Sequence, residues 1–413
     1  MIYDAWLQEQ KLDHEVKLPP AGAVKVPSRL GPDPAALARA AEMIAAAKHP
    51  VIITEYTGRD HDAFHSLVEL AEAGGIPVYD INARLSFPSR HPLNASLSKD
   101  HFRDADLVVC LDARDWEKPT TELVSTTREL TSVVPAGAKW IEIGFGDLEL
   151  SSWAMDYQRM NHADLRVMAD TTLAIPMLTE LLKARLAKDA KYRARVKART
   201  AEVAAKTRAR RDQWAAQAKD GWDASPIALP RLASEVWNAI KSEDWVLTAG
   251  TLEEWTRKLW DFDRPYRHAG RSLGTATQFG ISLGVALAHR GKKRLVVDLQ
   301  PDGDLMFDAG ALWVAAKHRI PMLVVMYNNR AYYNDWEHQI RMAKHRGTPV
   351  GRAHIGMDMT DPDPDFASMA KSMGWYAEGP IDDPKKVAAA LKRAIAKVKS
   401  GQPALLDTIT QKR

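Results

Sequence analysis

The chain has 413 residues, of which 46% are hydrophobic and 27% are charged, and this composition excludes a disordered or fibrous protein. Its length predicts two or three domains, each with its own core. No segment approaches the roughly 18 consecutive apolar residues of a membrane span, and the first residues lack a signal-peptide pattern, so we expect a cytoplasmic protein without membrane contact.

The net charge of +4 is unevenly distributed. Twelve Lys and Arg lie in residues 183–211, against only Asp189 and Glu202. Such a block either follows a nucleic-acid backbone or forms the solvated face of a helix that joins two domains. Only Tyr192 interleaves the basic residues, which is too little for base stacking. We favour the connecting helix and expect no nucleic-acid partner.

Predicted helices alternate with short apolar strands after an extended, proline-interrupted leader at 1–30. This alternation predicts a parallel sheet covered by helices on both faces. We assign 31–185 to a central α/β domain. A glycine follows the first strand, but Thr57-Gly58-Arg59 lacks the G-x-G-x-x-G spacing of a dinucleotide loop. The helices and strands expected in this domain are 34–47, 51–53, 64–73, 76–79, 106–111, 139–143 and 166–168.

A second alternating series follows the basic segment. We assign 186–225 to a charged helical linker and 226–413 to a second α/β domain. The expected fold class is therefore α/β, with two tandem Rossmann-like domains that each contain a helix-covered parallel sheet. The helices and strands expected in this part are 226–240, 245–248, 294–299, 307–318, 321–327, 387–399 and 404–409.

Two polar pairs end neighbouring strands of the second domain. Asp302-Gly303 follows one apolar strand, and Asn328-Asn329 follows the next, with 27 residues from Asp302 to Asn329. Because a right-handed crossover places both strand ends at one rim of the sheet, we expect these side chains to meet there. Mg²⁺ prefers hard oxygen ligands and often shares them with phosphate groups. We therefore predict a metal site formed by Asp302, Asn329 and a backbone carbonyl near Ala331, with Gly303 allowing close approach of a diphosphate.

This unit resembles the metal motif of the thiamine diphosphate-dependent decarboxylases and acetolactate (acetohydroxyacid) synthases, which is G-D-G followed roughly 24 to 27 residues later by N-N. Pro301 replaces the first glycine of that motif, and Asp304 stands where serine is frequent. The resemblance implies that the chain binds thiamine diphosphate and Mg²⁺. It also places Asp304 beside the diphosphate, so we expect its charge either to point away or to be offset by a cation.

Two further segments extend the resemblance. Gly250 and Thr251 match the turn that holds the far phosphate in the family. Residues 270–284 resemble the glycine-rich segment that cradles the aminopyrimidine, although this segment is about two residues longer than usual. There the resemblance implies cofactor contacts from Leu273, Gly274 and Thr275, with Leu273 forcing the bent cofactor shape. Glycines that permit close helix packing would explain the same segment.

The polar aromatic stretch 330–339 follows the second asparagine. In the family this region caps the thiazolium, which makes Asn334, Asp335 and His338 candidates for substrate contacts. A surface helix would explain the same residues equally well. The central domain resembles one that holds FAD in some members, but no residue here indicates a flavin contact.

The resemblance also implies what another chain must supply. Family members carry a pyrimidine-binding domain whose glutamate activates the cofactor, and no glutamate of this chain, Glu253 included, lies in a matching context. We therefore expect a split enzyme that acts on small 2-keto acids by decarboxylation or carboligation, with a separate subunit of about 180 residues in a hetero-oligomer such as α2β2. The alternative is a non-catalytic, cofactor-binding or regulatory subunit of such a complex.

Overall fold

The computed structural model describes residues 20, 22–23, 28–82, 84–146, 162–270 and 276–412. Most of the expected leader therefore lies outside the described residues. So do Leu273, Gly274 and Thr275.

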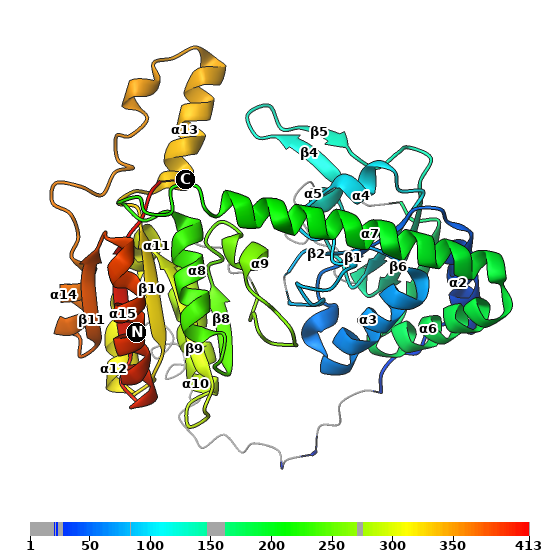
Figure 1. Cartoon of the computed structure of the whole chain (residues 1–413), viewed down its shortest axis with the longest axis horizontal. Coiled ribbons are helices and arrows are strands. Elements are labelled where there is room, and N and C mark those ends of the chain that lie inside the picture. The colour runs from blue at the N-terminus through cyan, green and yellow to red at the C-terminus, as the bar shows by residue number, and fades with distance from the viewer. Residues whose placement is uncertain are drawn as a thin grey trace, which may run out of the picture.

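Two parallel sheets dominate the described residues and lie side by side in Figure 1. Each has five strands, and each has helices on both faces, which confirms the expected fold class. No helix in the described ranges is both long and apolar enough to cross a membrane.

The central sheet has the strand order β2-β1-β3-β6-β7, and the paired strands run parallel. One face packs on α2, α3 and α6 through an aliphatic core that includes Ile52, Val109 and Ile141. The other face packs against a second apolar cluster that includes Phe102 and Trp116. The strands are β1 (Pro50–Thr54), β2 (Val78–Asp80), β3 (Leu107–Leu111), β6 (Lys139–Gly144) and β7 (Leu165–Met168), and the covering helices are α2 (Pro34–Ala46), α3 (His61–Gly74), α4 (Asp100–Arg103), α5 (Glu117–Thr120) and α6 (Thr171–Lys188).

The second sheet has the strand order β11-β12-β10-β9-β8. Alternate residues of its strands face opposite layers: Val297 packs toward α8 and α15, whereas Val296 packs toward α10 and α12. The strands are β8 (Trp245–Ala249), β9 (Leu295–Pro301), β10 (Leu323–Asn328), β11 (Tyr376–Ile381) and β12 (Ala404–Ile409), and the helices are α8 (Leu229–Ile240), α9 (Trp255–Leu259), α10 (Thr277–Ala288), α11 (Asp302–Phe307), α12 (Ala311–Lys317), α13 (Tyr333–Arg346), α14 (Phe366–Ser372) and α15 (Pro384–Lys399).

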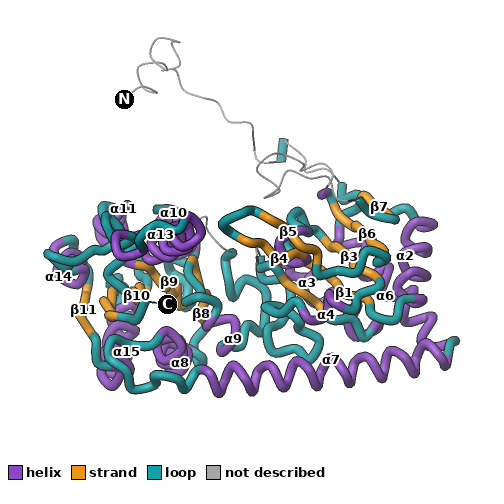
Figure 2. Tube along the Cα trace, turned by 90° about the horizontal axis from the view of Figure 1, so that it is seen from above, coloured by secondary structure: helices purple, strands orange, loops and turns teal. Residues whose placement is uncertain are grey.

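The basic segment forms the long helix α7 (Ala190–Gln217), which runs along the central unit in Figures 1 and 2 and reaches the second unit at its carboxyl end. Most of its cations are exposed, but Arg199 is 8% exposed. The Arg199 guanidinium donates to the carbonyls of Gly75 (3.0 Å), Ala47 (3.2 Å) and Lys48 (3.1 Å), and also to that of Gly74. One cation thus satisfies carbonyls at the carboxyl ends of both α2 and α3.

Several elements differ from the sequence-based expectations. The helix expected at 307–318 is confirmed over 311–317, as α12, but its start is wrong because Asp308-Ala309-Gly310 forms a turn. Helix α11, which precedes this turn, was not expected. Strand β11 was not expected; Gly379-Pro380 argues against a strand, but an edge strand tolerates proline because one side of its backbone has no partner strand. The antiparallel hairpin of β4 (Thr121–Val124) and β5 (Glu129–Ser132) was also not expected, nor were the short 3₁₀ turns η1 (Thr57–Arg59) and η3 (Val350–Arg352).

Candidate functional site

A cavity of about 310 Å³ lies at the carboxyl ends of β9 and β10. These strands are parallel neighbours, so Asp302 after β9 and Asn329 after β10 reach the same rim. The cavity is lined by Leu229, Glu253, Gln278, Pro301, Asp302, Gly303, Asp304, Phe307, Tyr327, Asn329, Ala331, Tyr332, Tyr333, Asn334, Asp335 and Gln411.

Asp302 is 1% exposed and held by backbone donors. Its Oδ1 accepts the N–H of Gly303 at 2.9 Å, and its Oδ2 accepts the N–H of Ala331 at 3.2 Å. Burial raises the pKa of this carboxyl to about 6, although these hydrogen bonds oppose the shift. A buried carboxylate without a cationic hydrogen-bond partner is stabilised by a bound metal ion.

The two asparagines have different environments. Asn328 is buried and donates from Nδ2 to Asp407 Oδ1 at 3.0 Å, while its own Oδ1 accepts the N–H of Arg330 at 3.1 Å. In contrast, Oδ1 of Asn329 is buried and has no hydrogen-bond partner among the described residues. The first asparagine therefore has a structural role, and the second presents an available oxygen to the cavity.

The backbone at Ala331 is also directed at Asp302. Residues 330–332 form a short antiparallel bridge with residues 357–359. In this bridge the N–H of Tyr332 donates to the carbonyl of Met357, and the N–H of Met359 donates to the carbonyl of Arg330. In this pattern both the N–H and the C=O of Ala331 point away from the partner segment. Its N–H reaches Asp302, so its carbonyl faces the same side.

One carboxylate, one carboxamide and one backbone carbonyl therefore converge at this rim. This set of hard oxygens fits Mg²⁺, which usually takes only one or two carboxylates and completes its shell with phosphate and water. The described residues contain no cluster of three or more His, Cys, Asp or Glu that could hold a metal. The orphaned Asn329 oxygen supports the same assignment.

Two glycines are required by close contacts at this end of the sheet. A Cβ at Gly303 would lie 2.6 Å from the Tyr332 ring, and one at Gly250 would lie 2.4 Å from Leu299 O. Gly250 also packs near Tyr327, which lines the cavity. Gly250 thus supports the cavity wall without lining the cavity itself.

The other predicted residues divide into two groups. Asn334 and Asp335, in the first turn of α13, line the cavity; Thr251 and His338 do not. Asp304 lines it and accepts the N–H of Ala276 at 3.1 Å through Oδ1, so this carboxylate anchors the backbone in front of α10. The cavity-lining residues that we did not predict as cofactor contacts include Gln278, Tyr327, Phe307, Glu253 and Gln411. One of them, Gln278, lies within residues 270–284, the segment that resembles the family's glycine-rich cradle.

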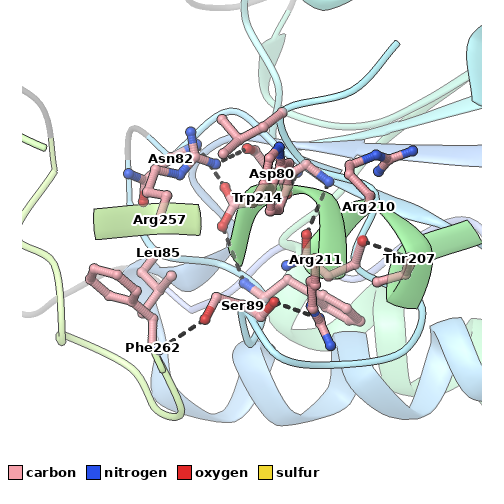
Figure 3. Close-up of a pocket in the computed structure, with 14 residues that line it drawn as sticks. Asp80, Asn82, Leu85, Ser89, Thr207, Arg210, Arg211, Trp214, Arg257 and Phe262 are labelled. Atoms are coloured by element: carbon pink, nitrogen blue, oxygen red, sulfur yellow. Dashed lines mark hydrogen bonds between the residues drawn. The ribbon is translucent and has the colours of Figure 1, made fainter. Parts of the chain in front are cut away.

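A second cavity lies between the two domains (Figure 3). Two of its three arginines are directed at backbone carbonyls: Arg257 donates to Asp80 O at 2.8 Å, and Arg211 donates to Ser89 O at 2.8 Å and to His91 O at 3.0 Å. The third, Arg210, donates to the Asp100 carboxylate at 3.1 Å. The bonds to carbonyls join α7 and α9 to the loop after β2. We therefore assign this cavity to the contact between domains rather than to a ligand.

Family comparisons agree with the fold and the site. Residues 37–178 match the model described as "Thiamine pyrophosphate enzyme, central domain", and residues 248–408 match "Thiamine pyrophosphate enzyme, C-terminal TPP binding domain". Together these matches cover most of the chain. The chain therefore belongs to the thiamine pyrophosphate enzymes and contains their central and C-terminal domains, which confirms the resemblance seen in the sequence.

Individual proteins are similar to the chain in sequence or in fold. A Mycobacterium tuberculosis protein described as "Putative acetolactate synthase large subunit IlvX" is 29% identical over 136 residues, which are 33% of this chain and 25% of that protein. The chain thus matches only a quarter of this relative's length. The benzoylformate decarboxylase of Polynucleobacter necessarius has a similar fold, with a TM-score of 0.69, 17% identity and coverage of 97% of this chain and 68% of the other. The 4-hydroxybenzoylformate decarboxylase of Rhodococcus jostii RHA1 has a TM-score of 0.67, 17% identity and coverage of 95% and 67%.

Proposed function

We propose that this chain is the diphosphate- and Mg²⁺-binding subunit of a thiamine diphosphate-dependent enzyme that acts on 2-keto acids, by decarboxylation or acetolactate synthase-like carboligation. The observation that carries the proposal is that Asp302, Ala331 and Asn329, with its orphaned oxygen, line one cavity. The names of the similar proteins, an acetolactate synthase subunit and two keto-acid decarboxylases, support the substrate class.

The chain's own residues bind and orient the cofactor. Asp302 and Asn329 hold the metal, and Gly303 lets the diphosphate approach the backbone. When bound, thiamine diphosphate supplies the carbon nucleophile that adds to a keto group and accepts the electrons released with CO₂. Tyr332, Tyr333 and Phe307 limit the access of water to the cavity, while Asn334 and Asp335 contact the substrate.

Cofactor activation requires a carboxylate paired with the pyrimidine ring, and we propose that a second polypeptide of about 180 residues contributes it. An apolar surface beside the cavity supports this part of the proposal. Helix α10 contains no charged residue, and the α10–α12 surface has large exposed apolar side chains. These are Ile281, Leu287, Met306, Phe307 and Trp313.

The first experiment is isothermal calorimetry of the purified chain with thiamine diphosphate, with and without Mg²⁺. Binding should require Mg²⁺, and Asp302→Ala should abolish it while the circular dichroism spectrum shows that the fold is intact. The matched control is Asp212→Ala, an exposed carboxylate on α7. Equal binding with and without the metal, or full binding by the Asp302 variant, would refute the site.

The second experiment tests the proposed subunit. The chain is co-expressed with the neighbouring reading frame, purified through a tag on one component, and assayed for CO₂ release from pyruvate and benzoylformate. Activity should appear only in the complex, and Trp313→Asp should weaken copurification without affecting cofactor binding. Turnover by the purified chain alone would exclude the split-enzyme arrangement. A stable complex that binds the cofactor and turns over neither compound would favour the regulatory alternative.

A further inference from the structure

Gln278 is a cavity-lining residue whose role the metal motif does not explain. It lies in the first turn of α10, and its side chain faces the same cavity as Asp302 and Asn329. Its Oε1 is buried and has no hydrogen-bond partner among the described residues. A buried carbonyl oxygen without a donor costs about 1 to 3 kcal/mol, so an oxygen in this position calls for a ligand that donates to it.

The residue that follows Asp302-Gly303 contacts the backbone just before Gln278. Asp304 Oδ1 accepts the N–H of Ala276, which has a positive φ of 69° and immediately precedes α10. Asp304 therefore holds the turn that starts the helix, two residues before Gln278. Through this contact Asp304, which stands where the family often has serine, is connected to the segment that contains Gln278.

The charge of the cavity indicates which kind of donor is needed. Its charged lining residues are all acidic, namely Glu253, Asp302, Asp304 and Asp335, and no Lys, Arg or His is among the described lining residues. A diphosphate or a substrate carboxylate offers only acceptors at neutral pH and cannot satisfy Oε1. A water bound to a divalent cation is a strong donor because the metal polarises its O–H bonds.

We propose that Gln278 is a positioning residue for the metal, and that its Oε1 accepts a hydrogen bond from a water molecule in the Mg²⁺ coordination shell. This inference rests on the proposed function, since it requires the metal at Asp302 and Asn329. Gln278 thereby fixes the orientation of the hydrated metal before the diphosphate completes the shell. The ligand class is a hydrated divalent cation.

Two substitutions distinguish this role from a contact with the diphosphate. Gln278→Leu removes the acceptor and should weaken Mg²⁺ binding in the presence of thiamine diphosphate by about three- to tenfold, the effect of one lost hydrogen bond. Gln278→Glu keeps an acceptor and adds a negative charge, so Mg²⁺ should bind at least as tightly as in the original chain. If the amide of Gln278 instead donated to a phosphate oxygen, the glutamate of the Gln278→Glu variant would repel the diphosphate. That variant would then bind Mg²⁺ and thiamine diphosphate more weakly than Gln278→Leu.

The measurement is calorimetric titration of Mg²⁺ into the full chain with saturating thiamine diphosphate. Water-proton relaxation with Mn²⁺ provides a second readout, because it reports water on the metal directly and should fall in Gln278→Leu. Gln213→Leu, an exposed glutamine on α7, is the matched control. Unchanged affinity and relaxation in Gln278→Leu, or a greater loss in Gln278→Glu than in Gln278→Leu, would overturn the inference. Failure of the proposed function is distinguishable, because then the original chain itself shows no Mg²⁺-dependent cofactor binding.

Discussion

The carboxylate of Asp302 accepts the backbone N–H of Ala331 at 3.2 Å. This bond ties the end of β9 to the turn after β10, and so joins the two halves of the metal motif before any ligand binds. The bridge between residues 330–332 and 357–359 holds Ala331 in the required orientation. The proposed metal site is therefore largely preformed by backbone contacts, which would reduce the reorganisation needed on binding.

The close contact between Gly303 and the Tyr332 ring makes a specific prediction. Gly303→Ala should displace the ring toward the cavity, because its Cβ would lie 2.6 Å from two ring carbons. We expect a loss of about 1 to 3 kcal/mol in the free energy of unfolding and weaker cofactor binding. Urea denaturation and calorimetry measure the two effects. The double variant Gly303→Ala/Tyr332→Ala should recover most of the lost stability, because the ring is no longer in the way. If the two substitutions instead lower the stability additively, the Tyr332 ring is not the obstacle.

The two asparagines should separate stability from binding. Asn328→Ala leaves the buried Asp407 carboxyl without its amide donor and should reduce the free energy of unfolding by about 1 to 3 kcal/mol. Asn329→Ala removes an oxygen that has no partner in the described residues, so stability should change little while Mg²⁺-dependent cofactor binding is lost. Urea denaturation should therefore show a loss of stability only for Asn328→Ala, and calorimetry should show the loss of Mg²⁺-dependent cofactor binding for Asn329→Ala. Equal effects of the two substitutions on either quantity would contradict the assigned roles.

Arg199 should be the most sensitive cation of α7. Arg199→Ala leaves buried carbonyls at the ends of α2 and α3 without donors, and we expect the free energy of unfolding to fall by roughly 2 to 4 kcal/mol. The control is Arg208→Ala, which removes an exposed cation of the same helix. Its free energy of unfolding should lie within about 0.5 kcal/mol of that of the original chain. Thermal and urea denaturation test both. A similar effect of the two substitutions would mean that α7 contributes mainly through its charge.

His268 predicts a loss of stability in acid. Burial lowers the pKa of this imidazole to about 4, and the nearby Arg257 charge acts in the same direction. Between pH 6.5 and 4 the unfolded chain binds a proton that the folded chain does not, so stability falls as the pH decreases through this window. The contribution is on the order of 2 to 3 kcal/mol.

His268→Gln should therefore flatten the pH dependence of urea unfolding between pH 7 and pH 4.5. The amide does not titrate and can still contact Asn82, which lies 3.2 Å from Nδ1 of His268. His318→Gln, an exposed histidine in the same domain, is the control. Parallel pH profiles for the His268 variant and the original chain would assign the acid sensitivity to other groups.

Local residue patterns predicted most of the sheet strands and their order of appearance. Apolar runs bounded by Pro, Gly or Asp marked β1, β3, β9 and β10, because buried parallel strands require continuous apolar residues. The sequence also predicted that Asp302 and Asn329 lie at the same rim, because neighbouring parallel strands end there. Strand β11 did not, because only its edge position makes Pro380 acceptable, and an edge position is a property of the assembled sheet.

The sequence by itself determined the fold class, the family and the residue types at the metal rim, because these depend on short-range periodicity and on the spacing between two strand ends. Tertiary structure decided how those residues divide their roles. Asn328 and Asn329 are adjacent and identical, yet one bonds Asp407 on β12 and the other faces the cavity. Asp304 has the charge of a metal ligand but anchors Ala276, two residues before the cavity-lining Gln278. Such roles depend on contacts between segments that are distant in the chain, which no local pattern records.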